Sequence, residues 1–508
     1  MPKFLNLSDI TYSYPGSSTV ALDGVSAVFA SGWTGVVGPN GCGKTTIARI
    51  ACGDGEPDSG TVSPKVSGLY CPQDPSLEPD SLYDFACDYS PETRLMRHSL
   101  NIDDDMLWRF SQLSCGEQKK IQVAIALWAQ PEVLAIDEPT NHVDAQCREE
   151  IRRAMASYQG IGILVSHDRE LLDSLAYQVL DFTGGRAVVR SGGYTQAVNQ
   201  REMERKGALH RRETAKADLR KLEREQRRRR ERAEKSSAMR SRGKLDKHDS
   251  DGRAKIGLAI VTGQDGKAGK LSGRMDARAE SAQRNLNAMR VEKRYEGDLW
   301  LDARPSRRSV VLKTEERVIP CGPNAELFAP ALHIGNTDHL GICGPNGGGK
   351  STLIRHLLSE SGQTGSLWCS EVDGVRTLYV GQEVEADDAK RFLETMEALS
   401  DVEKGLVLKG VSRLGSDPKR VIALAAASPG ELRKLAIVYG MLSSPQLIVL
   451  DEPTNHLDIQ SVEALERALS AFSGALILVS HDGIFLDRCT NRRLVVKRVG
   501  GKVEVSES

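Results

Sequence analysis

Short, largely apolar runs recur along the chain, and each one ends at glycine-rich or polar residues. Unbroken runs of this kind occupy residues 34–37, 133–136 and 162–165. Runs that are apolar at successive rather than alternate positions are typical of strands buried on both faces of a parallel sheet. We therefore predict an α/β fold, with the residues that follow these strands at the carboxyl edge of the sheet, where open α/β sheets bind ligands.

A different pattern fills the middle of the chain. Residues 197–255 are dominated by Arg, Lys, Glu and Ala, all of which favour helix, and glycines cluster at 263–269 before another helix-compatible stretch. This pattern predicts a long helical hairpin with its apex near residues 256–270 and breaks around Gly243 and at 249–252.

Three motifs occur twice, in the same order. The pairs are 38–45 (GPNGCGKT) with 344–351 (GPNGGGKS), 137–142 with 451–456 (both DEPTNH), and 166–168 with 480–482 (both SHD). A repeat of about 200 residues indicates duplicated domains rather than a solenoid, whose repeats are much shorter. We predict a first domain at 1–195, a helical linker at 196–305 and a second domain at 306–508.

The composition narrows the class of protein. The chain has 508 residues, enough for two or three domains, and contains no apolar run long enough to cross a bilayer. Its first residues lack the pattern of a secretory signal, so we expect a cytosolic protein. The ten cysteines include no C-x-x-C pair, which argues against a structural zinc site and a disulfide framework.

The net charge of −1 conceals a strong asymmetry. Residues 199–295 contain 29 Lys and Arg against 15 Asp and Glu, an excess of 14 positive charges, so the rest of the chain carries −15. The basic linker is therefore a candidate contact for a polyanion.

The repeated glycine loop has the spacing Gly-x-x-x-x-Gly-Lys-[Ser/Thr], between a predicted strand and a predicted helix. Glycines allow backbone N–H groups to point at phosphate, and the helix N-terminus adds a favourable dipole. We expect Lys44 and Lys350 to neutralise the β and γ phosphates, and Thr45 and Ser351 to coordinate Mg²⁺. The other predicted ATP-binding positions of the two loops are Gly38, Asn40, Gly41, Gly43, Thr46, Gly344, Asn346, Gly347, Gly349 and Thr352.

Acidic residues and a histidine follow the later strands of each repeat. Asp137 and Asp451 are expected Mg²⁺ carboxylates, and Glu138 and Glu452 are expected to polarise the attacking water. The acidic pair alone could be a surface helix cap. A histidine 29 positions after each glutamate favours catalysis. We expect these histidines, His167 and His481, to sense the γ phosphate, and we call them the switch histidines. Two glutamines at strand ends, Gln73 and Gln382, are predicted to bind ATP and Mg²⁺.

A further motif, called the signature below, lies 23 residues before each of Asp137 and Asp451. It begins at Ser114 in the first repeat and at Ser428 in the second. A serine at a helix start marks a second anion-binding terminus, and it is equally explained as a helix N-cap with a capping box. Both explanations hold together. The remaining predicted ATP-binding residues of these motifs are Gly116, Glu117, Gly430 and Glu431.

The complete order of motifs resembles that of the ATP-binding cassette ATPases. The resemblance covers about four-fifths of the chain and implies two P-loop cassettes that dock head to tail. Each ATP would lie between the glycine loop of one cassette and the signature helix of the other. The first site would then take Ser428 and Gly430 from the second cassette, and the second site would take Ser114 and Gly116 from the first.

The motifs of the two repeats differ at several positions. The second signature has Ala427, Pro429 and Leu432 where the family commonly carries Leu, Gly and Gln. Tyr14 is placed to stack on adenine in the first site, and no aromatic residue is matched to it upstream of Gly344. We expect unequal sites. Both still turn over ATP in this prediction, because both motifs keep the glutamate.

Two fused cassettes joined by a basic helical linker, without a membrane domain, resemble the ABC-F group of translation-associated ATPases. The resemblance implies a monomer that binds the ribosome near the tRNA exit site, with its linker reaching the P-site tRNA and the peptidyl-transferase region. Some members of that group give resistance to ribosome-targeting antibiotics. The predicted RNA contacts are Arg227, Arg228, Arg229, Arg230, Lys235, Arg240, Lys267 and Lys270.

Other functions fit part of this pattern. Glutamates interleaved with the arginines could pair with them and leave the hairpin as a solvated tether. The net positive charge and apolar Ile256, Leu258, Ile260 and Val261 near the apex favour a partner. The alternatives are an ATPase subunit of an ABC importer and a DNA-binding ABC ATPase, since phosphate contacts do not distinguish nucleic acids.

Overall fold

The computed structural model describes most of the chain. The described residues are 4–16, 20–141, 143–183, 186–239, 264–289, 304–321, 325–358, 367–372, 374–382, 390, 394–416, 429–500 and 502–507. They form two compact units. One unit contains both repeats, at Met1–Ala197 and Arg294–Ser508, and the other is the linker at Val198–Lys293.

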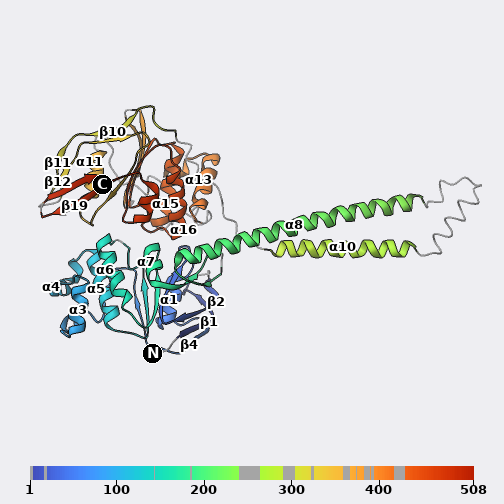
Figure 1. The fold of residues 1–508 in the computed structure, drawn as a ribbon, viewed down its shortest axis with the longest axis horizontal. Coiled ribbons are helices and arrows are strands. Elements are labelled where there is room, and N and C mark those ends of the chain that lie inside the picture. The colour runs from blue at the N-terminus through green and yellow to red at the C-terminus, as the bar shows by residue number, and fades with distance from the viewer. Residues whose placement is uncertain are drawn as a thin grey trace, which may run out of the picture. The chain divides into compact units, whose positions relative to one another are not determined.

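The first repeat is built on two sheets (Figure 1). A six-stranded sheet has the order β5-β6-β7-β3-β8-β9 and is parallel except for β9, and an antiparallel sheet has the order β2-β1-β4. The strands are β1 (Phe4–Ser13), β2 (Val20–Ala30), β3 (Gly32–Val37), β4 (Ser59–Ser63), β5 (Gly68–Cys71), β6 (Val133–Asp137), β7 (Ile161–Val165), β8 (Ala176–Asp181) and β9 (Val188–Ser191). The helices are α1 (Lys44–Cys52), α2 (Leu82–Cys87), α3 (Pro91–Ser99), α4 (Asp104–Trp108), α5 (Cys115–Trp128), α6 (Ala145–Ala156) and α7 (Arg169–Leu175).

The predicted central strands of the first repeat are confirmed. β6 and β7 are buried at every position, as their unbroken apolar runs indicate. Helix α1 packs on β5, β6 and β7, and its apolar face joins both sheets in one core. This packing fixes the start of α1 at the carboxyl edge of the parallel sheet.

The second repeat has the same parallel core within a larger sheet. The order is β11-β12-β20-β19-β14-β18-β17-β16-β15, with β10 and β13 forming a separate antiparallel pair. The strands are β10 (Val310–Thr314), β11 (Arg317–Pro320), β12 (Glu326–Ala329), β13 (Leu332–Gly335), β14 (His339–Cys343), β15 (Leu367–Val372), β16 (Val375–Val380), β17 (Leu447–Asp451), β18 (Ala475–Val479), β19 (Arg492–Val499) and β20 (Lys502–Glu507). The helices are α11 (Lys350–Leu357), α13 (Asp401–Arg413), α15 (Pro429–Leu442), α16 (Ile459–Ser470) and α17 (Gly483–Cys489).

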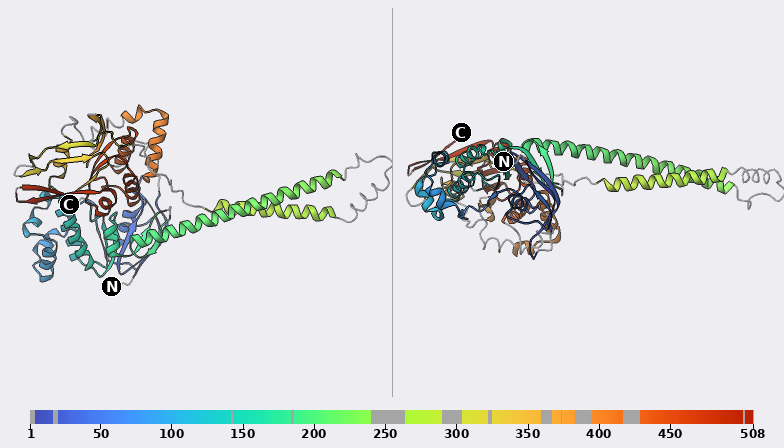
Figure 2. Two further views of the ribbon diagram at one scale, coloured as in Figure 1. Left: turned by 45° about the horizontal axis from the view of Figure 1, so that its top comes forward. Right: turned by 90° about the horizontal axis from the view of Figure 1, so that it is seen from below.

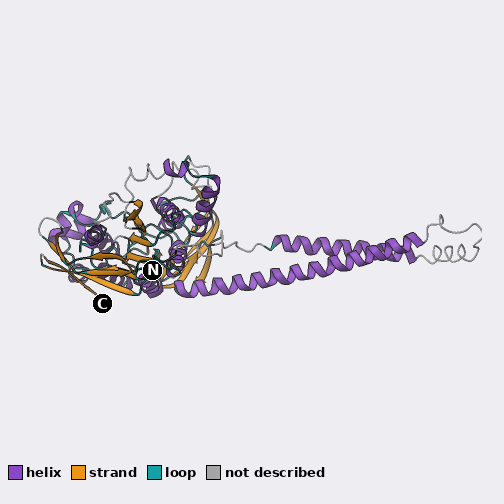
Figure 3. Ribbon diagram, turned by 90° about the horizontal axis from the view of Figure 1, so that it is seen from above, coloured by secondary structure: helices purple, strands orange, loops and turns teal. Residues whose placement is uncertain are grey.

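The linker unit contains two helices that lie side by side in every view (Figures 1 and 2). Helix α8 (Tyr194–Met239) begins where the sequence predicts, and α10 (Gln264–Ala288) runs back along it. Leu219 and Met275 are buried, and Gln226 donates a hydrogen bond to Asp276 across the pair. Helix is the only secondary structure in the described part of this unit (Figure 3).

The predicted apex of the hairpin needs one correction. Residues 264–270 belong to α10, although their glycines were expected to break the helix. A glycine costs a helix only about 1 kcal/mol relative to alanine, so the neighbouring helix formers prevail. The predicted breaks and the four apolar residues near the apex lie outside the described residues.

Two further features concern the whole chain. No helix within the described ranges is long and apolar enough to span a membrane. All ten cysteines lie within the described residues, and their thiols are free.

Candidate active sites

The first glycine loop connects β3 to α1. Gly43 precedes α1 with φ 97°, and a Cβ there would lie 2.8 Å from the carbonyl oxygen of Ala21. Only glycine fits this backbone without strain. Lys44 is buried, and its Nζ donates to the carbonyl oxygens of Gly38 at 3.0 Å and Pro39 at 3.1 Å. The ammonium group is therefore held across the loop that would surround a phosphate.

The second glycine loop repeats this geometry between β14 and α11. Gly349 has φ 92°, and Lys350 Nζ donates to the carbonyl oxygens of Gly344 at 3.0 Å and Pro345 at 3.1 Å. Lys350 Nζ also lies 3.0 Å from Nε2 of His481. Burial lowers the pKa of Lys350, as expected for an ammonium group removed from water.

The aspartate at the end of each central strand faces the loop hydroxyl. Thr45 Oγ1 donates to Asp137 Oδ2 at 2.6 Å, and Ser351 Oγ donates to Asp451 Oδ2 at 2.9 Å. Burial raises the pKa of Asp451. One hydroxyl and one carboxylate oxygen converge in each site, and such hard oxygen donors are what Mg²⁺ prefers beside phosphate. The residues present therefore fit the predicted metal.

Each glutamate that follows this aspartate is joined to the switch histidine. Glu138 Oε1 lies 3.2 Å from His167 Nε2, and Glu452 Oε1 lies 3.3 Å from His481 Nε2. The backbone N–H of each histidine also donates to the other carboxyl oxygen, at 3.2 Å and 3.3 Å. The spacing of 29 residues thus reflects two neighbouring strands that end side by side.

Burial shifts the pKa values of these four groups in opposite directions. It raises the pKa of Glu138 to about 8, helped by the charge of Asp137, and raises that of Glu452 to about 7. Burial and the nearby lysine charge lower the pKa of both His167 and His481 to about 3. A base with a pKa near neutrality suits proton transfer at physiological pH.

The backbone is strained at both glutamates. Glu138 has φ 46° and Glu452 has φ 48°, a region that non-glycine residues seldom adopt. Their N–H groups donate to Val165 and Val479 on the neighbouring strands at 2.8 and 2.9 Å. Strain that recurs at equivalent positions of a duplicated site is typical of a functional constraint.

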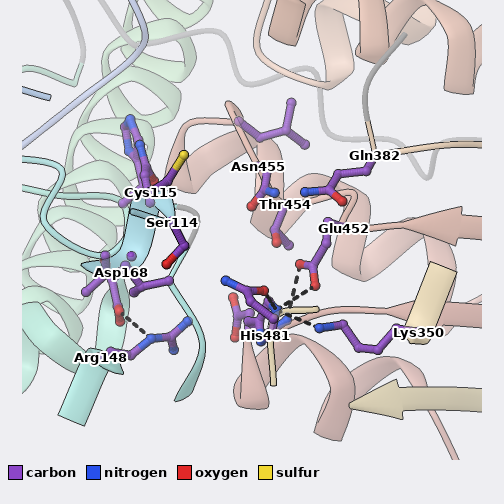
Figure 4. A pocket seen from close by; sticks show the side chains of 18 of the residues that line it. Ser114, Cys115, Arg148, Asp168, Lys350, Gln382, Glu452, Thr454, Asn455 and His481 are labelled. Atoms are coloured by element: carbon purple, nitrogen blue, oxygen red, sulfur yellow. Dashed lines mark hydrogen bonds and ion pairs between the residues drawn. The ribbon is translucent and has the colours of Figure 1, made fainter. Parts of the chain in front are cut away.

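One cavity of about 390 Å³ is lined by residues of both repeats (Figure 4). Ser114, Cys115 and Gly116 line it from the start of α5, while Lys350, Glu452 and His481 line it from the second repeat. Ser114 is the N-cap of α5. The cavity thus combines the second glycine loop with the first signature helix, as the resemblance to cassette ATPases predicts.

A second cavity, of about 480 Å³, contains the first glycine loop. Its lining includes Tyr14, Gln73, Glu138 and Gly430, the last from the second repeat. The Tyr14 hydroxyl is 2.8 Å from Thr46 Oγ1. The residues after Glu452 also reach this loop, since Asn40 Nδ2 donates to the carbonyl oxygen of His456 at 3.0 Å.

The predicted signature residues differ in their surroundings. The carboxylate of Glu117 accepts hydrogen bonds from the backbone N–H and hydroxyl of Ser114 at 2.9 and 2.6 Å, which completes a capping box. Glu117 does not line the cavity that contains Ser114. Glu431 lines a neighbouring space of about 280 Å³ together with Asn40 and Gly41. Ser428 lies outside the described residues.

Other predicted positions are placed as follows. Gln382 lines the cavity of the second loop together with Asn346 and Gly347. Asn346 Oδ1 is 2.9 Å from His481 Nε2, whereas the Thr352 hydroxyl accepts a hydrogen bond from Cys321 Sγ at 3.7 Å.

The sequence analysis missed the buried cations of the signature helices, of which Lys119 and Arg433 contact the glutamine loops. Lys119 Nζ donates to the carbonyl oxygens of Pro72 and Gln73. Arg433, at the equivalent position of α15, donates to the carbonyl oxygens of Gly381, Gln382 and Glu452. The available signal was a pair of cations immediately before the largely apolar second half of each helix, at 121–128 and 435–442.

On the linker, three of the predicted RNA contacts have described side chains. Arg227 and Arg228 are exposed, and Arg229 pairs with Glu225 one turn earlier. The side chains of Arg230, Lys235, Arg240, Lys267 and Lys270 lie outside the described residues.

Comparison with known proteins agrees with this geometry. The ABC transporter family matches at residues 22–141 and 329–455. The fold and the paired sites therefore define an ATP-binding cassette ATPase with two cassettes, a class that binds ATP together with Mg²⁺. The relatives refine this class, because the chain is similar over almost its whole length to proteins of the ABC-F group.

The relatives align along almost the whole chain. Ribosome protection protein VmlR of Bacillus subtilis is 27% identical and covers 100% of this chain and 89% of its own length. Energy-dependent translational throttle protein EttA of Escherichia coli K12 is 25% identical, covering 93% and 88%. ABC transporter F family member 2 of Arabidopsis thaliana is 27% identical, covering 98% and 77%.

A solved structure confirms the arrangement of the fold. The RNase-L Inhibitor structure superposes with a TM-score of 0.62 at 18% identity, covering 98% of this chain and 90% of that one. At this identity the likeness extends to the fold alone.

Proposed function

We propose that this chain is a cytoplasmic ABC-F translation factor that binds the ribosome near the tRNA exit site and uses ATP to control its release. Its linker would reach the P-site tRNA and the peptidyl-transferase region. The observation that carries the proposal is a cavity lined by the second glycine loop and the first signature helix, in a chain whose linker is basic. ATP-driven closure and a polyanion contact are thereby combined in one chain.

The residues of each site have distinct tasks in this proposal. Lys44 and Lys350 move from their own loop carbonyls to the phosphates, which replace those carbonyls as partners. Asp137 with Thr45, and Asp451 with Ser351, would hold Mg²⁺, which supplies positive charge beside the phosphates when it is bound. Glu138 and Glu452 orient and deprotonate the attacking water, while the neutral histidines hold the terminal phosphate.

Closure has a direct geometric basis. The first signature helix presents its N-terminus at Ser114 to the loop of the second cassette, and such a terminus attracts an anion. ATP thus binds the closed arrangement more tightly than the open one, and this difference is what shifts the population. Hydrolysis removes the bridging phosphate and reopens the cassettes.

The linker supports ribosomal RNA as the partner. Helix α8 carries 15 Lys and Arg against 8 Asp and Glu, a net charge of +7. Phosphate contacts from such a helix release counterions and give affinity that falls steeply with salt. Two relatives are named for ribosome protection and for throttling translation, and protection against an antibiotic is part of this proposal.

Co-sedimentation with ribosomes tests the proposal. The Glu138→Gln, Glu452→Gln protein binds ATP without turning it over, so it should pellet with ribosomes when ATP is present and be lost as salt rises. The Lys44→Ala, Lys350→Ala protein serves as the control that cannot close. Equal pelleting with and without ATP, or none, would overturn the proposal. Co-purification with membrane subunits would support an importer, and duplex-stimulated hydrolysis would support DNA maintenance.

A further inference from the structure

The first turn of the linker helix α8 is attached to both cassettes. Tyr194 is buried, and its hydroxyl donates to Glu463 Oε1 on α16 of the second cassette at 2.9 Å. Thr195 donates from its N–H and its hydroxyl to Asp173 on α7 of the first cassette, at 2.9 and 2.5 Å. Gly193 lies so close to α7 that a Cβ there would be 2.6 Å from Asp173 Oδ1.

The same two cassette helices are joined directly by Arg169. This residue is the first of α7, and its Nη1 lies 3.0 Å from Glu466 Oε2 on α16. Both side chains are at least nine-tenths buried. Arg169 Nη2 is also 3.5 Å from Asp482 Oδ2. Arg169 therefore links the start of α7, which follows His167 and Asp168 in the chain, with Asp482, the residue after His481.

These contacts close a circuit of three helices. Arg169 and Asp173 lie one turn apart on α7, and Glu463 and Glu466 lie one turn apart on α16. Tyr194 completes the circuit from α8. We call Arg169, Asp173, Tyr194, Thr195, Glu463 and Glu466 the linker-root junction. An opening of the cassettes that separates α7 from α16 must break the Arg169 pair and also release the first turn of α8 from one of the two helices.

The junction exists on one side of the molecule only. A spacing of 314 residues relates Asp137 to Asp451 and His167 to His481. The same spacing places Gly483 at the position of Arg169 and Arg152 at the position of Glu466. Glycine cannot form an ion pair, and Arg152 instead pairs with Glu149 on its own helix. The first turn of α8 is thus held by one set of contacts, and this set lies next to the first switch histidine, His167.

We propose that the linker-root junction couples ATP-dependent closure of the cassettes to the order of the linker's first turn, with Arg169 as its positioning residue. Closure brings Glu466 to Arg169 and Glu463 to Tyr194 together. The two partners lie on different cassettes, so their ion pair forms when the cassettes close and is lost when they open, whereas the pair of Glu466 with Arg488 lies within one cassette and persists. This inference rests on the proposed use of the linker, and its test requires no ribosome.

Hydrogen exchange measured by mass spectrometry provides the test. In the Glu138→Gln, Glu452→Gln protein, ATP should slow exchange both in the first glycine loop and at residues 194–205. Adding Arg169→Met or, separately, Tyr194→Phe should abolish the ATP-dependent slowing at 194–205 while the slowing at the glycine loop persists. Arg169→Lys keeps a cation near Glu466 and should restore it in part.

The controls separate coupling from simple loss of structure. Arg152 of the first cassette takes the position equivalent to Glu466, and Arg152→Met should leave both ATP effects intact. Tyr194→Phe removes a single hydroxyl, so it tests the junction even if Arg169→Met fails to fold. Undiminished slowing at 194–205 in both Arg169→Met and Tyr194→Phe overturns the proposal. Loss of slowing in the glycine loop as well also overturns it, because the residues would then act on ATP binding itself.

Discussion

The hydroxyl of Tyr70 donates a hydrogen bond of 2.9 Å to Oδ2 of Asp137. This is the oxygen that also accepts the bond from Thr45. Tyr70 lies on β5, which pairs with β6, so the sheet itself fixes the phenol beside the carboxylate. Burial, followed by the charge of Asp137, raises the pKa of Tyr70, and the phenol therefore stays a donor.

We predict that Tyr70→Phe weakens Mg²⁺ binding at the first site. A hydrogen bond to a charged group contributes about 1.5–3 kcal/mol, and without it Asp137 loses one of its two orienting donors. The Mg²⁺ concentration for half-maximal hydrolysis should rise several-fold. Tyr379→Phe is the matched control, because the Tyr379 ring lies beside Trp368 at 5.5 Å between centroids. An unchanged Mg²⁺ titration for Tyr70→Phe would contradict this role.

Each cassette site is predicted to hydrolyse ATP. Glu138→Gln and Glu452→Gln, made singly, each remove the base of one site and leave the residues of the other intact. Each single variant should release one phosphate per chain in a single-turnover experiment, and the double variant should release none. Release of no phosphate by either single variant would show that the sites cannot act separately.

The buried glutamates should make the nucleotide-free protein less stable as pH rises. Their folded pKa values, about 8 for Glu138 and about 7 for Glu452, exceed the ordinary value of 4.5. The folded state therefore holds more protons than the unfolded state, and this stabilisation is lost as pH rises through 7 and 8. The loss between pH 6.5 and 8.5 is about 3 kcal/mol for the two groups together.

The histidines act in the opposite direction at lower pH. Their folded pKa of about 3 is below the ordinary 6.5, so their contribution is lost as pH falls from 6.5 towards 3.

Urea unfolding of the wild type and of the Glu138→Gln, Glu452→Gln protein at pH 6.5 and 8.5 isolates the contribution of the two glutamates. A decrease of equal size in both proteins would contradict the assignment.

Arg433→Met should destabilise the second cassette more than Lys119→Met destabilises the first. Arg433 is buried and donates to several carbonyl oxygens around Glu452 and Gln382. Each carbonyl left without a partner costs about 1–3 kcal/mol. Thermal unfolding followed by calorimetry measures the difference. Equal stabilities for the two variants would show that the additional bonds of Arg433 add nothing.

Changing Arg227, Arg228 and Arg229 together to Ala should weaken ribosome binding and its salt dependence. Each lost phosphate contact reduces the slope of log affinity against log salt by about 1. Arg153→Ala, which removes an exposed arginine from α6, is the control. An unchanged slope in the triple variant would favour a linker that is only a solvated tether.

The sequence predicted the parallel core and the neighbourhood of each site because those features depend on local patterns. Unbroken apolar runs gave β6 and β7, and the repeated glycine spacing placed Lys44 and Lys350 at helix starts. The expected pairing of Ser114 with the loop of Lys350 came from resemblance to a family. No local pattern contains it.

Contacts between distant segments were beyond the sequence. Arg169 and Glu466 are almost three hundred residues apart, and each looks like an ordinary helix charge in its own segment. The start of α10 at Gln264 was missed for a different reason, because glycine is only a weak helix breaker. The roles of the individual site residues and the linker contacts stay predictions.

The one-sided pair of Arg169 and Glu466 also bears on which cassettes can associate. In a dimer of two first cassettes, the position of Glu466 would be taken by Arg152, and two cations would face each other. In a dimer of two second cassettes, Gly483 would remove the cation that faces Glu466 across the interface, although Arg488 of the same cassette would still pair with Glu466. Unlike halves are thus favoured over like halves by repulsion as well as attraction. Association of two molecules through like cassettes is therefore disfavoured, because neither like pair can form the contact between Arg169 and Glu466.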